Sequence, residues 1–469
     1  MSEVIIIGAG LAGSEAALQL SKRGIKVKLY EMRPNKSTGA HVGSDCAEFV
    51  CSNSLGSSDI TNASGLLKKE MELLGGELIK IAIENSVPAG NALAIAREDF
   101  SKAVTKRIED DSNIELIREE LKEIPQGNVI VASGPLTSDS LAQSIRDFTE
   151  SEHLHFFDAI APIVELESIN FDKAFWASRY DKGEASYINC PMNKEEYEKF
   201  YSILINAPRI EQHDVDKKSK YFESCLPVEV LASRGVDTLR FGPMKPVGLV
   251  DKRTNIENYA VVQLRQDNSA KTLFNLVGFQ TNLKWGAQKE LLQAIPGLEN
   301  VNIVRYGVMH RNTFINSPQV LNSTLEARKR EGLFFAGQLT GTEGYTESIA
   351  TGMLAGVNMA KRILKEELLI LPKETILGAL VRYISDSEHT QFQPINSNWA
   401  LVPPVELPKK ERKNKKLKNE LFPIEFPLLI LHNPNCWLFS IVGSCILKEA
   451  TVLIFVLFNI AIAQNHTSS

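Results

Sequence analysis

The feature that most constrains the fold of this 469-residue chain is a glycine-rich turn between a strand and a helix near its N-terminus. The β-branched run 4–7 is typical of a strand buried in a parallel sheet. A G-x-G-x-x-G turn over 8–13, a helix, a second strand over 26–30 and then Glu31 follow in that order. This order and spacing predict the first strand–helix–strand unit of a dinucleotide-binding domain.

The chemistry of a dinucleotide assigns a role to each part of this unit. Gly8 allows the tight turn, Gly10 lets the backbone approach a pyrophosphate, and Gly13 lets the helix pack closely against the strand. The helix N-terminus offers N–H groups and a partial positive charge to the phosphates. The acid after the second strand is placed to accept hydrogen bonds from a ribose. The predicted cofactor-binding residues here are Gly8, Ala9, Gly10, Leu11, Ala12, Gly13 and Glu31.

A second glycine-rich segment lies far along the chain. The apolar stretch 333–336 leads into Gly337 and Gln338, and Gly344 and Tyr345 precede a helix of small residues. Flavoproteins of the two-dinucleotide-binding type close their FAD site with a late strand of this kind, so these residues are also predicted to bind FAD. The N-terminus of the late helix would stabilise negative charge on a reduced flavin. Its small side chains indicate packing against the cofactor or against another backbone.

The two segments together predict an α/β fold class: a two-dinucleotide-binding, Rossmann-like FAD domain split by an α+β insertion domain. We expect residues 1–150 and 315–405 to form the two parts of the FAD domain. Residues 151–314 carry Phe- and Tyr-rich strands, tight turns and a helical stretch over 194–205, as an insertion that covers the flavin would. Residues 406–469 are interpreted as a basic linker and a divergent apolar tail.

Composition and charge limit the classes of function. With a net charge of −5, the chain could bind nucleic acid only through a local basic patch. Six cysteines in a chain of this length do not form a disulfide framework, and no Cys/His cluster has the spacing of a zinc site. The N-terminus runs directly into a strand and leaves no room for a signal peptide. We therefore expect a cytoplasmic protein without a metal site.

Further motifs narrow the family. They occupy residues 31–34, 48–55, 187–192, 222–229, 240–249, 277–283 and 305–313. Together they closely resemble the folate- and FAD-dependent tRNA uracil-5-methyltransferases (the TrmFO family), which are relatives of the larger GidA flavoproteins that modify the wobble uridine of tRNA. The resemblance runs from residue 1 to about residue 404.

This resemblance implies a reaction. NADH or NADPH reduces the flavin, the reduced flavin collects a methylene group from methylenetetrahydrofolate, and a uridine in the T loop of tRNA receives it as a methyl group at C5. The cleft between the FAD domain and the insertion would hold the folate and the flipped-out base. The expected partners are therefore tRNA and folate.

The resemblance also implies two functional cysteines, which match Cys51 and Cys225. Uracil C5 becomes nucleophilic once a group has added at C6, and a thiolate is suited to that addition. We assign Cys225 as the nucleophile at C6 and Cys51 as a proton-transfer or adduct-stabilising partner beside the flavin, with the reverse assignment left open. Cys190 is interpreted as structural and Cys46 as incidental.

Other polar residues are weaker candidates for contacts to the cofactor, the folate tail or RNA: Arg97, Arg240, Lys245, His310, Arg311 and Gln338. A solvated charge or a structural hydrogen bond explains each of them equally well. The basic group Lys217, Lys218 and Lys220 is interpreted as a solvated face in preference to an RNA contact.

The C-terminal segment departs from the resemblance. Residues 408–420 carry seven basic side chains against two glutamates, as expected of a basic helix that contacts an RNA backbone. Beyond residue 421 the sequence is strongly apolar, but its uninterrupted apolar pieces are too short for a comfortable membrane span. A shifted reading frame or a replaced C-terminus is favoured over a tail anchor. The oligomeric state stays open.

Three alternative functions stay open. A wobble-uridine-modifying tRNA flavoprotein would carry a longer helical C-terminal domain and need not have both Cys51 and Cys225. A small-molecule flavin oxidoreductase would need no basic RNA surface. A catalytically inactive tRNA-binding protein would result if the altered tail has inactivated the chain.

Overall fold

The computed structural model describes residues 3–38, 40–150, 154–181, 184–210, 220–221, 226–254, 256, 258–388 and 392–403, without the side chains of 154–159, 220–221 and 309–311. The chain up to Pro403 forms one compact unit. The predicted basic linker and apolar tail lie outside the described residues.

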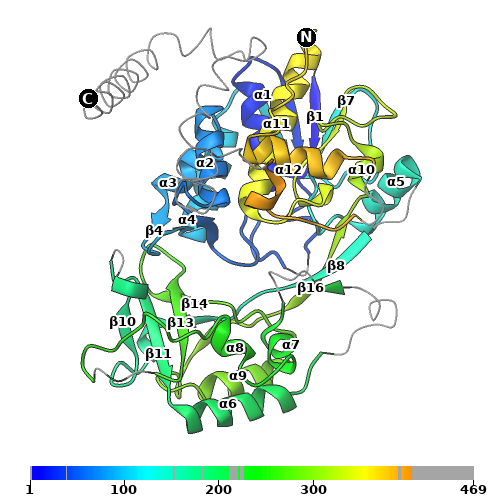
Figure 1. Ribbon diagram of the computed structural model, residues 1–469. Coiled ribbons are helices and arrows are strands. Elements are labelled where there is room, and N and C mark those ends of the chain that lie inside the picture. The colour runs from blue at the N-terminus through cyan, green and yellow to red at the C-terminus, as the bar shows by residue number, and fades with distance from the viewer. Residues whose placement is uncertain are drawn as a thin grey trace, which may run out of the picture. The chain divides into compact units, whose positions relative to one another are not determined.

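A five-stranded sheet carries the N-terminal glycine-rich turn (Figure 1). Its strands, in spatial order, are β17 (Leu333–Phe335), β7 (Asn128–Val131), β1 (Val4–Ile7), β2 (Val27–Tyr30) and β6 (Ile114–Ile117). Every pairing is parallel. The late strand β17 therefore ends at the same edge of the sheet as β1, which confirms the predicted α/β class and the return of the chain to the nucleotide-binding unit.

Two helices from opposite ends of the sequence pack side by side against this sheet, α1 (Leu11–Ser21) and α11 (Tyr345–Ile363) (Figure 1). Glycines make the contact close. A Cβ atom on Gly352 would lie 2.2 Å from the carbonyl oxygen of Ala12, and one on Gly356 would lie 2.8 Å from that of Ala16. Of the two predicted alternatives, the small residues of the late helix therefore pack against another backbone.

Further helices and a small sheet belong to this part of the described chain. The helices are α2 (Ala63–Leu73), α3 (Leu78–Glu84), α4 (Arg97–Glu109), α5 (Asp139–Thr149), α10 (Ser317–Val320) and α12 (Ile376–Ser385). A small antiparallel sheet, in the order β3-β5-β4, comprises β3 (Ser54–Ser57), β5 (Ala92–Ile95) and β4 (Ser86–Val87). This small sheet begins directly after the loop that carries Cys51.

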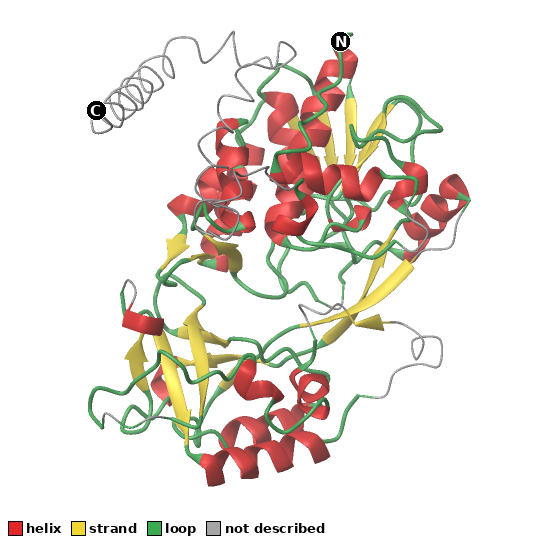
Figure 2. Ribbon diagram, in the orientation of Figure 1, coloured by secondary structure: helices red, strands yellow, loops and turns green. Residues whose placement is uncertain are grey.

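The middle of the chain forms a second, antiparallel sheet with its own core (Figure 2). Its strands, in spatial order, are β10 (Phe175–Ala177), β11 (Tyr187–Met192), β13 (Ala260–Gln266), β14 (Leu273–Leu276), β9 (Ile163–Glu165) and β15 (Ile303–Arg305). Four helices share its apolar core: α6 (Lys194–Asn206), α7 (Val228–Ser233), α8 (Thr238–Phe241) and α9 (Trp285–Gln293). The helix predicted over 194–205 is confirmed as α6.

Two long strands connect the parallel sheet with the antiparallel one. The chain runs towards the antiparallel sheet along β8 (Leu154–Ala159) and returns along β16 (Met309–Phe314), and the two strands pair antiparallel. A short strand, β12 (Lys220–Tyr221), pairs with β8 on its other side. The two segments in which the chain passes between the sheets, β8 and β16, therefore lie next to each other.

Candidate functional site

The glycine-rich turn leaves a helix N-terminus open on one side. Gly8 has a φ of +99°, and a Cβ atom there would lie 2.6 Å from the carbonyl oxygen of Ala132. A Cβ atom on Gly13 would lie 1.8 Å from the carbonyl oxygen of Gly8, so α1 packs directly on the turn. A Cβ atom on Gly10 would meet no atom within 4 Å, and this N-cap residue of α1 makes no side-chain capping bond. The turn thus leaves space for a phosphate beside Gly10. The partial positive charge at the N-terminus of α1 would stabilise the negative charge of that phosphate.

A cavity at the carboxyl edge of the parallel sheet brings the two glycine-rich segments together. Its lining includes the predicted residues Gly8, Gly10, Leu11, Ala12, Glu31, Gly337, Gln338 and Tyr345. Ala9 and Gly13 belong to the same turn but are not among the residues that line this cavity. The N–H of Ala9 donates to Glu31 Oε2 at 3.2 Å, which connects the turn to the acid after β2.

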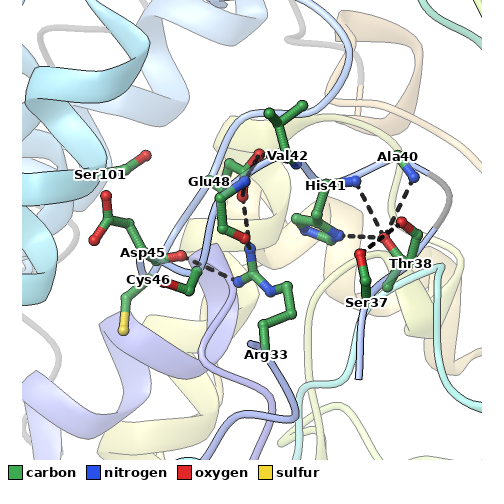
Figure 3. Close-up of polar contacts among 12 residues, drawn as sticks. Arg33, Ser37, Thr38, Ala40, His41, Val42, Asp45, Cys46, Glu48 and Ser101 are labelled. Atoms are coloured by element: carbon green, nitrogen blue, oxygen red, sulfur yellow. Dashed lines mark hydrogen bonds and ion pairs between the residues drawn. The ribbon is translucent and has the colours of Figure 1, made fainter. Parts of the chain in front are cut away.

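A buried ion-pair cluster lines this cavity, and Figure 3 shows its Arg33–Glu48 pair. Arg33 Nε donates to Glu31 Oε1 at 2.9 Å, and Arg33 Nη1 donates to Glu48 Oε2 at 2.6 Å. Burial alone would raise the pKa of Glu31, but the hydrogen bond and the charge of Arg33 lower it. Glu31 therefore stays ionised and able to accept hydrogen bonds from a ribose hydroxyl.

A second cavity adjoins the first and is lined by Cys51 and by the predicted residue Gly344. The two linings share four residues: Val50, Pro135, Gln338 and Tyr345. The two cavities therefore form one cleft that runs from the glycine-rich turn to Cys51.

The backbone of Cys51 is held by side chains from distant parts of the chain. Its N–H donates to Tyr345 Oη at 2.6 Å, and its carbonyl oxygen accepts from Arg97 Nη2 at 3.1 Å. Arg97 Nη1 also donates to the carbonyl oxygen of Phe49 at 3.2 Å. Arg97 Nε pairs with Asp267 Oδ1 at 2.9 Å, and both side chains are buried. Arg97, a weak candidate for a cofactor or RNA contact, is therefore a positioning residue for the Cys51 loop.

Asn53 extends this network towards the antiparallel sheet. Its Nδ2 donates to the carbonyl oxygen of Gln266 at 2.8 Å, and its Oδ1 accepts from Arg265 Nε at 2.9 Å and from Asn275 Nδ2 at 3.0 Å. The Nδ2 of Asn275 also donates to Asp267 Oδ1 at 3.0 Å. Burial lowers the pKa of Arg265. Because this buried network has so many hydrogen-bond partners, it restricts the loop that carries Cys51 and Asn53 to one conformation.

The described cysteines differ in their surroundings. Cys46 and Cys190 are fully buried, whereas Cys51 is only partly buried. Burial raises the pKa of the Cys46 thiol to about 11 and also raises the pKa of Cys190. Both of these thiols stay protonated at neutral pH, which makes them poor nucleophiles. The structural interpretation of Cys190 is confirmed by its place in the core of the antiparallel sheet.

Several predicted residues are not covered by the described part of the chain: Cys225, Lys217, Lys218, and the side chains of Lys220, His310 and Arg311. Two other weak candidates are placed. The Arg240 guanidinium stacks on the ring of Tyr259, with 3.4 Å between its central carbon and the ring centroid, and it donates to the carbonyl oxygen of that tyrosine. Lys245 is exposed. Arg240 therefore has a structural contact of its own.

Sequence reasoning missed Arg33 and Glu48 as wall residues, although both stand in the motifs at 31–34 and 48–55. An arginine two positions after the acid predicted to bind the ribose was the signal available. Thr38 and His41 also line the cavity, with 2.6 Å between Thr38 Oγ1 and His41 Nδ1 (Figure 3). Nothing in the sequence marked these two residues.

The described residues contain neither a metal-binding cluster nor a membrane-spanning helix. None of the described His, Cys, Asp and Glu side chains form a group of three or more that could hold a metal ion. Among the described helices, none is long and apolar enough to cross a membrane.

Comparisons with known proteins agree with this architecture. The family model described as "Glucose inhibited division protein A" matches residues 3–367. The methylenetetrahydrofolate–tRNA-(uracil-5-)-methyltransferase TrmFO of Exiguobacterium sp. is 56% identical over 414 residues, which cover 88% of this chain and 95% of that protein. The Bacillus subtilis protein of the same name is 55% identical over 419 residues, which cover 89% and 95%.

A solved structure shares the fold. GidA of Aquifex aeolicus, in its form II crystal, superposes with a TM-score of 0.64 at 18% identity. The superposition covers 92% of this chain and 75% of that one. At this level of identity, the likeness concerns the fold alone.

Proposed function

Because this chain belongs to the glucose inhibited division protein A family and, within it, to the TrmFO methyltransferases, we propose that it methylates uracil C5 in tRNA with methylenetetrahydrofolate as the one-carbon donor. The target is a uridine of the T loop, FAD is the resident cofactor, and NADH or NADPH is the reductant. The high identity to TrmFO proteins over nearly their whole length favours this function over wobble-uridine modification and over small-molecule oxidation.

The observation that carries this proposal is the continuous cleft between Gly10 and Cys51. Its residues suit a flavin dinucleotide. Gly10 and the N-terminus of α1 would hold the pyrophosphate, and Glu31 would accept hydrogen bonds from the ribose. Gly344 and Tyr345, at the N-terminus of α11, would stabilise negative charge on the ring system. When bound, FAD supplies the two electrons that convert a transferred methylene group into a methyl group.

The chain itself contributes two thiols from separate segments. Cys225 adds to uracil C6 and so makes C5 nucleophilic, and Cys51 holds or moves a proton at the flavin end of the cleft. Cys51 is suited to this second role because both its N–H and its carbonyl oxygen are fixed by other residues. The role of Cys225 rests on the family motif at 222–229.

We place this activity in the cytoplasm, because the substrate is tRNA and both thiols must stay reduced.

The proposal is tested with purified protein, unmodified tRNA transcript, labelled methylenetetrahydrofolate and NAD(P)H. We expect the protein to purify with FAD and to transfer the label to a T-loop uridine as 5-methyluridine. A folded preparation that cannot be reconstituted with FAD, or one whose flavin is reduced while the tRNA stays unlabelled, would contradict the proposal. Label in the anticodon loop would favour wobble-uridine modification.

A further inference from the structure

An exposed pair of aromatic rings lies at the start of α9. Trp285 is 60% exposed, and its ring stacks on that of Tyr306 with 5.3 Å between the centroids and 17° between the planes. An exposed, stacked aromatic pair offers a large and rigid apolar face that a partner can cover. The stacking also fixes the orientation of the exposed indole face before any partner binds.

This pair lies beside the points where the segment carrying Cys225 is attached. The N–H of Ile210, on the N-terminal side of that segment, donates to the carbonyl oxygen of Asn282 at 2.9 Å. The N–H of Val228, on its C-terminal side, donates to the carbonyl oxygen of Gln280 at 2.7 Å. Both attachment points therefore lie within five residues of Trp285 in the sequence.

Tyr306 connects the pair to the rim of the cleft. Its neighbour Arg305 donates through Nη2 to the carbonyl oxygen of Ala40 at 2.8 Å, in the loop whose residues Thr38 and His41 line the cavity. On its other side, the N–H and the carbonyl oxygen of Gly307 both pair with the side-chain amide of Gln288 in α9, each at 2.8 Å. Tyr306 is thus held between the cleft and α9.

Lysine side chains lie next to the pair, although the chain as a whole is acidic. Lys284 directly precedes Trp285. Lys199 of α6 and Lys289 of α9 line a groove, and these two helices lie next to each other (Figure 1). All three lysines are exposed, and none of them forms an ion pair with another described residue. Glu290 is the one acid in the lining of this groove. These lysines are suited to bind a phosphate backbone.

We propose that Trp285 and Tyr306 form a stacking platform for an unpaired base of the tRNA, next to the base that enters the cleft, while Lys284 and Lys289 bind the adjoining phosphates. This inference rests on the proposed function, since it names the part of the protein that receives the tRNA loop. Unpaired bases of RNA loops are commonly recognised by stacking on aromatic side chains, and stacking tolerates any base because each has a π face.

The chain supplies a matched control. Trp176 is 43% exposed and stacks on Phe171 at 5.9 Å between the centroids and 11° between the planes. It lies on β10, at the edge of the antiparallel sheet opposite to β15, which leads to Tyr306. Both tryptophans are exposed and stack on one neighbouring ring, but Trp176 lies on the strand at the far edge of the sheet from the strand that leads to Tyr306.

The test compares the dissociation constant of unmodified tRNA transcript and the KM for tRNA among FAD-bound variants. Trp285→Ala is expected to weaken binding and raise the KM by about tenfold or more, while kcat and flavin reduction by NAD(P)H stay unchanged. Trp285→Phe should restore most of the affinity, and Trp176→Ala should bind like the wild type. Lys284→Ala combined with Lys289→Ala should lower the slope of log affinity against log salt by about 1 to 2.

Unchanged tRNA affinity in Trp285→Ala, or an equal loss in Trp176→Ala, would overturn the platform. If the wild type transferred no methyl group, the proposed function would be wrong. The tRNA-binding assay would still test the stacking platform of Trp285 and Tyr306 independently. If Trp285→Ala bound a protein partner more weakly but bound tRNA as the wild type does, the surface would belong to that protein partner. This result would also overturn the inference.

Discussion

The two ends of the cleft are held in different ways. At the nucleotide end, the turn is fixed by its own neighbours: the N–H of Gly8 donates to the carbonyl oxygen of Tyr30 at 2.8 Å, and Gly13 packs on Gly8. At the other end, the Cys51 loop is held by side chains that lie 46 positions (Arg97) and 294 positions (Tyr345) away in the sequence.

This difference separates the contacts that form the cofactor-binding end of the cleft from the contacts that position the Cys51 loop for the reaction. A local backbone motif makes a cofactor site that depends on small residues and on little else. A loop held by long-range side chains depends on the packing of both sheets, because Asp267, which fixes Arg97, follows β13 of the antiparallel sheet. Mutations at the two ends should therefore have separable effects.

The largest effect is expected at the nucleotide end. Gly13→Ala places a Cβ atom 1.8 Å from a backbone oxygen, so we expect a protein that does not fold stably. Gly10→Val faces open space in the protein and should fold, but its branches occupy the approach of the pyrophosphate and should abolish FAD binding. The measurements are thermal unfolding of the apoprotein and the flavin absorbance after reconstitution. A stable Gly13→Ala variant, or a Gly10→Val variant saturated with FAD, would contradict the comparison.

The next effect is expected at Arg97. Arg97→Ala leaves the carboxylate of Asp267 buried without its charged partner, which should cost about 3 kcal/mol of folding stability. It also releases the carbonyl oxygens of Phe49 and Cys51, and methyl transfer should fall about 100-fold. FAD should still bind. We measure thermal unfolding, FAD affinity and single-turnover methylation.

Arg97→Lys is the matched control for this variant. A lysine keeps a positive charge near Asp267 but lacks the planar fork that reaches both carbonyl oxygens. Stability should largely return while methylation stays low. Equal recovery of both quantities would show that Arg97 acts only through stability.

A smaller effect is expected for Tyr345→Phe. This change removes the hydroxyl that accepts the N–H of Cys51 but keeps the ring packed on Phe49, with 4.3 Å between the centroids. Losing one such hydrogen bond is worth about 1 kcal/mol, so turnover should fall about fivefold with FAD affinity unchanged. If FAD affinity falls and turnover per bound FAD does not, the hydroxyl of Tyr345 belongs to the cofactor end of the cleft instead.

The smallest effect on activity is expected for a long-range contact away from the cleft. Glu70 of α2 accepts the N–H groups of Ile376 and Leu377 at 2.7 and 2.8 Å, and burial raises its pKa from 4.5 to about 8. Between these two pH values the folded state holds a proton that the unfolded chain has released. The contribution of Glu70 to stability is therefore full below pH 4.5 and is lost as the pH rises towards about 8.

Glu70→Gln should remove this dependence. The melting temperature of the variant relative to the wild type should rise from pH 5 to pH 8, with methylation and FAD affinity unchanged. A difference in melting temperature that does not vary with pH would show that Glu70 is not the titrating group.

The nucleotide end could be predicted from the sequence because its determinants are local. Strand, turn, helix and acid follow one another within the first 31 residues, and glycines are required wherever backbones touch. The late strand was predicted for the same reason, since Gly337 follows a short apolar run. The packing of α11 against α1 was left as one of two alternatives, because small residues suit either a cofactor or a backbone.

The Cys51 end could be predicted only in part. The family motif drew attention to the cysteine, but no local pattern indicates that Arg97 binds its carbonyl oxygen or that Asp267 holds Arg97. These pairings depend on how the antiparallel sheet meets the parallel one, which is a property of tertiary packing. The sequence offered Arg97 as a cofactor or RNA contact for that reason, and the buried ion pair assigns it a positioning role.

The central claim is that two thiols from separate segments act on one uracil, with Cys225 as the nucleophile at C6. A tRNA that carries 5-fluorouridine at the target position tests it most directly, because fluorine cannot leave as a proton does and the covalent complex should accumulate. With methylenetetrahydrofolate and NAD(P)H present, the wild type and Cys51→Ala should trap the tRNA, while Cys225→Ala should not, although its FAD is still reduced. A covalent complex in Cys225→Ala that is absent from Cys51→Ala would reverse the two roles, and normal methylation of tRNA by both variants would contradict the thiol mechanism.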